Sequence, residues 1–230
     1  MTALLAAAVS IALLHTLIGV DHYLPFVVLG RARKWSFKRV MAITALCGVG
    51  HCVGSVVLGF VGIGLGVAVG RLEWIEGIRG SLAAWSLIAF GLVYATWSMV
   101  RLARGRQHEH VHAHEDGTLH SHEHDHHAEH LHPHAGKALT VWSVFIIFVL
   151  GPCEPLIPLL MAPAFEYDGL VVAAVAGAFG GTTVLTMMGA AAVGWWGLSL
   201  KAFRGVERYA NVLAGSAIAA SGLAIQVLGI

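Results

Sequence analysis

The sequence has few charged residues, and this scarcity excludes an ordinary soluble domain. Only 12% of its 230 residues are Asp, Glu, Lys or Arg, whereas 57% are hydrophobic. A soluble globular domain has about 25% charged residues. The composition therefore indicates an integral membrane protein whose surroundings are a lipid bilayer.

Cysteine is also scarce. Cys47, Cys52 and Cys153 all lie in apolar stretches, which excludes an extracellular disulfide framework. The sequence has no nucleotide-binding motif, so any energy source is a gradient or a partner. We expect neither an enzyme nor a bound cofactor, and no nucleic-acid partner.

Six long apolar blocks are present, and each can span the roughly 30 Å of hydrocarbon as a helix. They cover residues 3–29, 40–70, 80–100, 138–164, 169–200 and 207–229. The second and fifth are longer than a span needs, which indicates tilt, a kink or a non-membrane end. The sequence therefore predicts an all-α integral membrane fold with six transmembrane helices.

Basic residues are concentrated in alternate connections between these blocks. The second connection holds only Arg71 and Arg79, which Glu73 and Glu76 offset, and the fourth holds none. The other twelve flank the first, third and fifth connections: Arg31, Arg33, Lys34, Lys38, Arg39, Arg101, Arg104, Arg106, Lys137, Lys201, Arg204 and Arg208. The positive-inside rule then predicts that both termini lie outside and that the third connection is cytoplasmic.

The third connection is rich in histidine. Between residues 108 and 134 it holds 12 of the 15 histidines and six acidic residues, with almost no apolar side chains. Such a segment is expected to lack fixed structure without a ligand, and its donors suit Ni, Co, Zn or Cu. The alternative is a solvated linker with incidental histidines. The predicted loop ligands are His108, His110, His112, His114, His120, His122, His124, His126, His127, His130, His132 and His134.

The sequence repeats weakly at an offset of 132 residues, so that "VDHYLPFVVLG" aligns with "PCEPLIPLLMA". Three helices per repeat place the two units in opposite orientations, as in inverted-repeat transporters. We predict repeats at residues 1–104 and 138–230, joined by the His-rich loop at 105–137. The offset aligns Asp21 with Cys153, His22 with Glu154, Gly48 with Gly180, His51 with Thr183 and Gly62 with Gly194.

Asp21 and Glu154 are the only acidic residues in the interior of the apolar blocks, and they occupy nearly equivalent positions in the repeats. An ionisable side chain within a membrane span is costly and indicates a function, although a helix–helix contact is an alternative. Nearby prolines, Pro25 in the first repeat and Pro152 in the second, leave backbone carbonyls without helical partners. These carbonyls are further candidate cation ligands, and a simple kink is the alternative.

A metal site is predicted where these features meet. His15 and His22 are seven residues apart and share a helix face, and Asp21 either orients an imidazole or binds the ion. His51 lies among small residues that permit close helix approach. The predicted ligands are His15, Asp21, His22, His51, Cys153 and Glu154, with Cys47 and Thr183 as accessory residues.

The motifs "HTLIGVDH" and "GVGHCVG" resemble the nickel/cobalt transporter superfamily, including its urease-accessory membrane branch and its exporters. That family carries H-x4-D-H on an early helix and His-Ser on the next. Here five residues separate His15 from Asp21, and His-Cys replaces His-Ser. The resemblance implies transport of nickel or cobalt through a bacterial inner membrane, with zinc or copper as further substrates, and we favour export.

Two alternatives stay open. "GPCEPLIP" resembles the Pro-Cys helices of membrane thiol-disulfide carriers, which would make Cys153 a redox residue. Such carriers use one cysteine from each repeat. Here the residue aligned with Cys153 is Asp21, and a carboxylate at that position favours ion binding over redox chemistry. The second alternative is a metal sensor or metallochaperone at the membrane, which does not need an inverted repeat.

Overall fold

The computed structural model describes residues 1–104, 111–113, 119–121, 133–197 and 207–228, and this part of the chain is almost entirely helical. The helices are α1 (Thr2–Ile18), η1 (Val20–His22), α2 (Leu24–Ala32), α3 (Phe37–Gly64), α4 (Val69–Arg104), α5 (Pro133–Leu150), α6 (Leu156–Ala164), α7 (Gly169–Gly197), η3 (Glu207–Tyr209) and α8 (Ala210–Leu228). Here η1 and η3 are short 3₁₀ helices.

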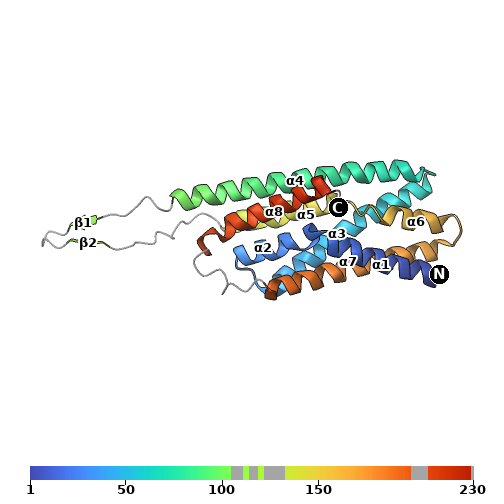
Figure 1. The fold of residues 1–230 in the computed structure, drawn as a ribbon, viewed down its shortest axis with the longest axis horizontal. Coiled ribbons are helices and arrows are strands. Elements are labelled where there is room, and N and C mark those ends of the chain that lie inside the picture. Colours follow the sequence, from blue (N-terminus) through green and yellow to red (C-terminus); the bar gives the residue numbers. More distant parts are fainter. Residues whose placement is uncertain (105–110, 114–118, 122–132, 198–206, 229–230) are drawn as a thin grey trace.

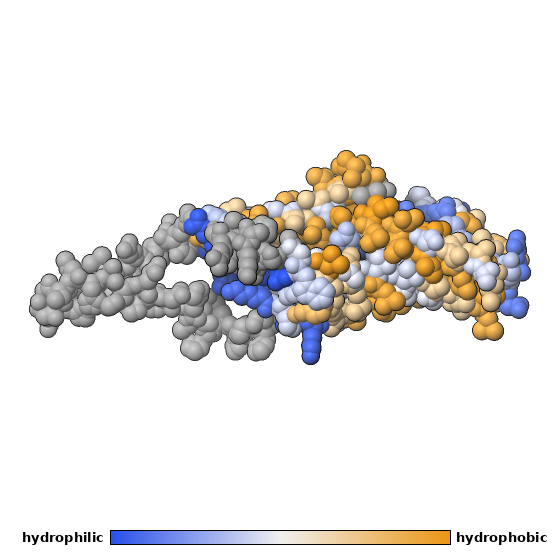
Figure 2. Space-filling model, turned by 60° about the horizontal axis from the view of Figure 1, so that its bottom comes forward, coloured by the Kyte–Doolittle hydropathy of each residue, from blue (hydrophilic) through white to orange (hydrophobic). Residues whose placement is uncertain are grey.

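In the part of the chain that the structure describes, four helices, α3, α4, α7 and α8, are long and apolar enough to cross a membrane. Helix α1 and residues 140–150 of α5 are shorter apolar helices. Many large apolar side chains are exposed, among them Leu185 and Val193 on α7. Figure 2 shows hydrophobic residues gathered over the middle of one face and hydrophilic residues towards both ends. The prediction of a helical membrane protein is confirmed to this extent.

The first and fourth apolar blocks are broken helices. The chain leaves α1 at Gly19, passes through η1 and resumes as α2, while α5 and α6 are separated at residues 151–155. Pro25, Pro152 and Pro155 lack the N–H that a continuous helix needs at these points. In Figure 1 both breaks lie near the middle of the bundle, beside the long helices α3 and α7.

The helices pack in a reciprocal pattern. The α1 helix packs on α7 and α5 on α3, whereas α3 packs on α7 and α4 on α8. The α4–α8 contact is close because a Cβ at Gly91 would lie 2.4 Å from the Ala219 nitrogen, and one at Gly215 would lie 2.6 Å from the Ala95 nitrogen. Small residues at such crossings let the backbones of membrane helices approach one another.

An arginine network ties the helices together at the end of the bundle where α2 and α4 end (Figure 1). Arg33 donates hydrogen bonds to the Tyr94 hydroxyl at 2.9 Å and to Thr140 Oγ1 at 2.8 Å. Tyr94 in turn donates to Asn211 Oδ1 at 2.7 Å. Arg31 donates to the Trp195 carbonyl and lies over its ring. The C-terminal end of α2 is thereby held to α4, α5, α7 and α8.

The connection between the second and third blocks is shorter than predicted. The α4 helix begins at Val69, so Glu76 and Arg79 lie within it, and Glu76 is 0% exposed. Glu76, which the sequence placed in a connection, is therefore a further acidic residue buried between the helices. Glu76 is accommodated because Ser55 donates to it at 2.8 Å and Arg79 forms an ion pair with it.

Part of the His-rich loop forms a small hairpin, in which β1 (Val111–Ala113) pairs antiparallel with β2 (Leu119–Ser121) and His112 lies opposite His120. These six residues pair their backbone groups in the structure, where the sequence predicts no fixed structure without a ligand. His134 lies in the first turn of α5. The other predicted loop ligands lie outside the described residues.

Candidate metal centre at the helix breaks

Three histidines meet where the first broken helix crosses α3. His15 lies in the last turn of α1, His22 in η1 and His51 in the middle of α3. The His15 and His22 rings have centroids 4.9 Å apart, and those of His22 and His51 are 5.0 Å apart. The break in the first helix therefore gathers all three predicted intramembrane histidines.

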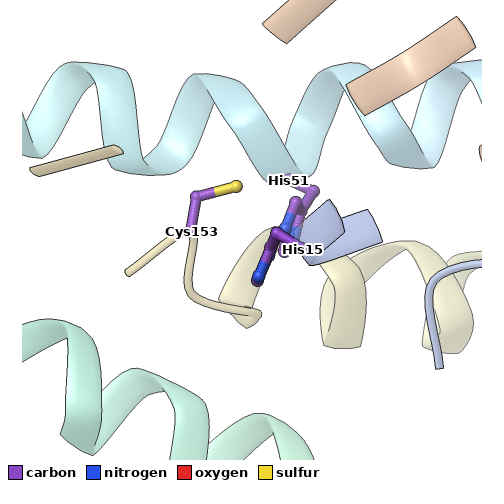
Figure 3. Close-up of side chains that lie close together, drawn as sticks. All are labelled: His15, His51 and Cys153. Carbon is purple, nitrogen blue, oxygen red and sulfur yellow. The ribbon is translucent and has the colours of Figure 1, made fainter. Parts of the chain in front are cut away.

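Cys153 joins this group from the second break. One ligand atom each from His15, His51 and Cys153 lies within 4.8 Å of the other two. In Figure 3 the Cys153 sulfur is directed towards the two imidazoles beneath α3. Cys153 and His51 are buried, so the group lies inside the protein and draws on both halves of the chain.

Hydrogen bonds determine which ring nitrogens face the centre. His22 Nδ1 lies 3.0 Å from the Gly19 carbonyl and His51 Nδ1 lies 3.3 Å from the Phe148 carbonyl. A carbonyl only accepts, so each Nδ1 donates a proton, and in the neutral imidazole each Nε2 keeps its lone pair. This is the arrangement typical of histidine ligands of metals, where the second nitrogen fixes the ring.

The Nε2 atoms are the ones without partners. Among the described residues, Nε2 of His15, His22 and His51 is buried with no hydrogen-bond partner. Buried polar side-chain atoms are nearly always paired, so three unpartnered nitrogens in neighbouring rings need an explanation. A cation held by His15, His51 and Cys153 would satisfy two of them, whereas His22 lies beside this group and is not part of it.

Glycine permits the close approach of backbone and imidazole at both breaks. A Cβ at Gly19 would lie 2.4 Å from His22 Nδ1, and one at Gly151 would lie 3.0 Å from His51 Nδ1. Gly19 and Gly151 stand at the same point of the two broken helices. Each keeps one histidine in position because it has no side chain.

Asp21 lies behind His22. Its Oδ1 is 3.3 Å from His22 Nδ1, on the side of the ring away from the orphaned nitrogen. Asp21 is not among the ligand atoms that come together with Cys153. The geometry gives it the orienting role that the sequence left open beside direct binding.

The remaining predicted residues are more dispersed. Glu154 is exposed and lines the cavity beside the centre without joining the ligand group. Thr183 is fully buried and lies beside Cys52. Cys47 packs in a different apolar cluster, with Met187 and Phe26.

Sequence reasoning missed Cys52 and a polar group around Cys153. The Cys52 and Cys153 thiols lie against one another in one buried cluster. The Cys153 N–H donates to Ser55 Oγ at 3.1 Å and to Glu76 Oε2 at 3.0 Å. The sequence signal for this group was the position of Ser55, which follows His51 by one helical turn and so lies on the same face of α3.

The freed carbonyls near the second break have protein partners. Arg79 Nη2 donates to the carbonyls of Val149 at 2.9 Å and Gly151 at 3.3 Å. The Phe148 carbonyl, which lacks an N–H four residues later because of Pro152, accepts from the Gly151 N–H at 3.1 Å and faces His51 Nδ1. The carbonyls that Pro152 and Pro155 free therefore already have protein donors.

A cavity of about 480 Å³ adjoins the centre. The histidines and Asp21 line one part of it, and Glu154, Ser81 and Gln226 line another. Since Glu154 and Ser81 are exposed, the cavity links the buried ligands with the surface beside the first half of α4.

The chain matches no family model, no curated protein and no solved structure. The chemistry of the centre is therefore the basis for a function. Two imidazoles and one thiol, with a third imidazole beside them, suit borderline transition metals, whereas Mg²⁺ and Ca²⁺ prefer oxygen ligands.

Proposed function

We propose that this protein carries a divalent transition metal ion, nickel or cobalt foremost, across a membrane. The observation that carries the proposal is the ligand group of His15, His51 and Cys153 inside a helical membrane protein. Among the described residues, the buried Nε2 atoms of both histidines have no hydrogen-bond partner. The helix breaks place these donors in the bundle interior, where transporters of several folds bind their ions.

Two further features support a transporter built from inverted repeats. Helices α2 and α6 begin at residues 24 and 156, and α3 and α7 at 37 and 169, so both pairs are 132 residues apart. The contact of α1 with α7 is mirrored by that of α5 with α3. We infer six spans, in which α1 with α2 and α5 with α6 are broken spans.

The two ends of the bundle differ in a way that suits alternating access. The cavity joins the centre to the surface beside the first half of α4. At the opposite end Arg33 holds α2 to Tyr94 and Thr140. In this proposal the structure is one access state, and release of the Arg33 contacts opens the centre to the other side.

The charge pattern gives this proposal its direction. By the positive-inside rule the arginine network and the His-rich loop are cytoplasmic and the cavity faces outwards. A cytoplasmic collector of metal ions supplies an exporter, so we favour export. Metal binding displaces protons from thiol and imidazole ligands, and this makes a proton gradient a suitable energy source.

Flux measurements in proteoliposomes test the proposal. Vesicles of both protein orientations are loaded with a metal-sensitive dye and exposed to Ni²⁺, Co²⁺, Zn²⁺, Cu²⁺, Mn²⁺ and Mg²⁺. We expect protein-dependent flux of Ni²⁺ or Co²⁺ and none of Mg²⁺, because Mg²⁺ prefers oxygen ligands. His22→Ala abolishes the flux. Absence of flux for every ion contradicts the proposal.

A thiol-disulfide carrier is the second candidate, because Cys52 lies against Cys153. In that reading the two thiols give two protons and two electrons to a quinone or protein disulfide and form a disulfide bond. Cys52→Ser separates the candidates. It abolishes disulfide exchange in a redox carrier, whereas it leaves most metal flux intact if Cys153 serves as a ligand.

A further inference from the structure

We infer that the ion pair of the buried Glu76 with the partly buried Arg79, together with Ser55, acts as a clamp that positions Cys153 for the metal ion. The inference rests on the proposed metal centre and adds positioning residues to it. Glu76 and Arg79 lie on α4, Ser55 lies on α3, and none of them is among the predicted ligands.

The clamp replaces a helical hydrogen bond that the second break removes. In a continuous helix the Cys153 N–H would donate to the Val149 carbonyl. Here that N–H donates to Glu76 Oε2 at 3.0 Å and to Ser55 Oγ at 3.1 Å. The Val149 carbonyl instead accepts from Arg79 at 2.9 Å. One ion pair thus satisfies both partners of the missing bond.

The same arginine compensates for a proline. Because Pro155 has no N–H, the Gly151 carbonyl has no partner one turn later. Arg79 Nη2 donates to it at 3.3 Å. The chain on both sides of Cys153 is therefore fixed by a charged pair from a neighbouring helix.

Burial shows that the clamp is an organised unit. Glu76 is 0% exposed, and Arg79 and Ser55 both donate to it. The desolvation of a charged pair inside a protein costs about as much free energy as the pair's attraction returns, so stability alone does not explain its presence. Its contacts converge on the one residue that the second half of the chain contributes to the ligand group. We expect its removal to weaken the metal site more than it changes the fold.

Cobalt binding to the protein without residues 108–134, in detergent and under reducing conditions, tests the clamp. A Cys153–Co²⁺ bond gives a near-ultraviolet sulfur-to-metal band. Glu76→Gln combined with Arg79→Gln leaves no unpaired charge, and Ser55→Ala is the milder variant. We expect a loss of the sulfur band and a 10–100-fold weaker Kd in the double variant, as for other partners that orient ligands. Ser55→Ala weakens binding less.

Matched controls lie on the same helix. Glu73 and Arg71 are exposed, so Glu73→Gln with Arg71→Gln removes the same charges without touching Cys153. This variant retains the wild-type band and Kd. Size-exclusion chromatography and helicity confirm that each variant is folded.

Alkylation by N-ethylmaleimide gives a readout without metal. Mass spectrometry follows Cys153 against Cys47, which is buried in a separate cluster. The clamp variants alkylate Cys153 several-fold faster, whereas Cys47 is unchanged. A wild-type band and Kd in the folded double variant, with unchanged Cys153 alkylation, overturn the inference. If the wild-type protein binds no cobalt but the clamp variants still expose Cys153, the proposed metal centre is wrong. The positioning of Cys153 by the clamp is then retained.

Discussion

The imidazole rings of His22 and His51 lie 5.0 Å apart and nearly perpendicular, although η1 and α3 bring them from separate segments. Each donates through Nδ1 to a backbone carbonyl at a helix break, Gly19 for one and Phe148 for the other. The breaks therefore set the direction of the rings as well as the place where they meet.

The position of Asp21 behind His22 predicts a graded effect of substitutions. Asp21→Asn removes the charge that holds the ring, yet the Gly19 carbonyl still accepts from it. We expect a metal Kd about 10-fold weaker, at the low end for outer partners of a ligand histidine. His51→Gln removes a donor and weakens binding by about 100-fold or more. Equal losses by isothermal titration would make Asp21 a direct ligand.

The glycines at the breaks give a steric prediction. Gly19→Ala places a methyl group against His22 Nδ1, and Gly151→Ala places one against His51. Both shift a ligand ring, so we expect at least a 10-fold loss of metal affinity in a folded protein. Gly189→Ala is the control, because a Cβ there meets nothing within 4 Å. It is expected to stabilise α7 by about 0.5–1 kcal/mol. Unchanged affinity in Gly151→Ala would remove His51 from the centre.

Deletion of residues 108–134 separates the loop from the centre. The loop histidines are expected to provide several weak sites, whereas the buried donors lie elsewhere in the chain. Equilibrium dialysis is expected to show fewer bound ions, with one tight site retained and some flux preserved. A deletion protein that keeps its tight site but transports nothing would give the loop a direct part in translocation.

The charge asymmetry predicts the orientation in the membrane. In a background without Cys47, Cys52 and Cys153, single cysteines are placed at Ser121 and Asp168. An impermeant thiol reagent on whole cells labels only position 168, because the fourth connection lacks basic residues. Labelling at position 121 would reverse the assigned topology and the favoured direction of export.

Much of the helical architecture could be predicted from apolar blocks, because a membrane span must pair its backbone internally. Pro25 and Pro152 indicated the breaks. The role of Glu76 could not be predicted, since its partners Ser55 and the Cys153 N–H are distant in sequence and meet only through packing. The contact of Cys52 with Cys153 was missed for the same reason. The offset of 132 residues shows which positions of the two repeats are equivalent, but it does not show which side chains touch where the repeats pack together.

In the proposed transport mechanism, imidazoles and Cys153 hold the transported ion between the two broken helices. X-ray absorption at the nickel or cobalt edge tests it most directly, on the loop-deleted protein loaded with one equivalent of metal. We predict imidazole nitrogens at about 2.0–2.1 Å and one sulfur at about 2.3 Å, by analogy with zinc sites. His51→Gln removes one imidazole, and Cys153→Ser removes the sulfur. A shell of oxygen ligands alone, unchanged by both substitutions, would contradict the account.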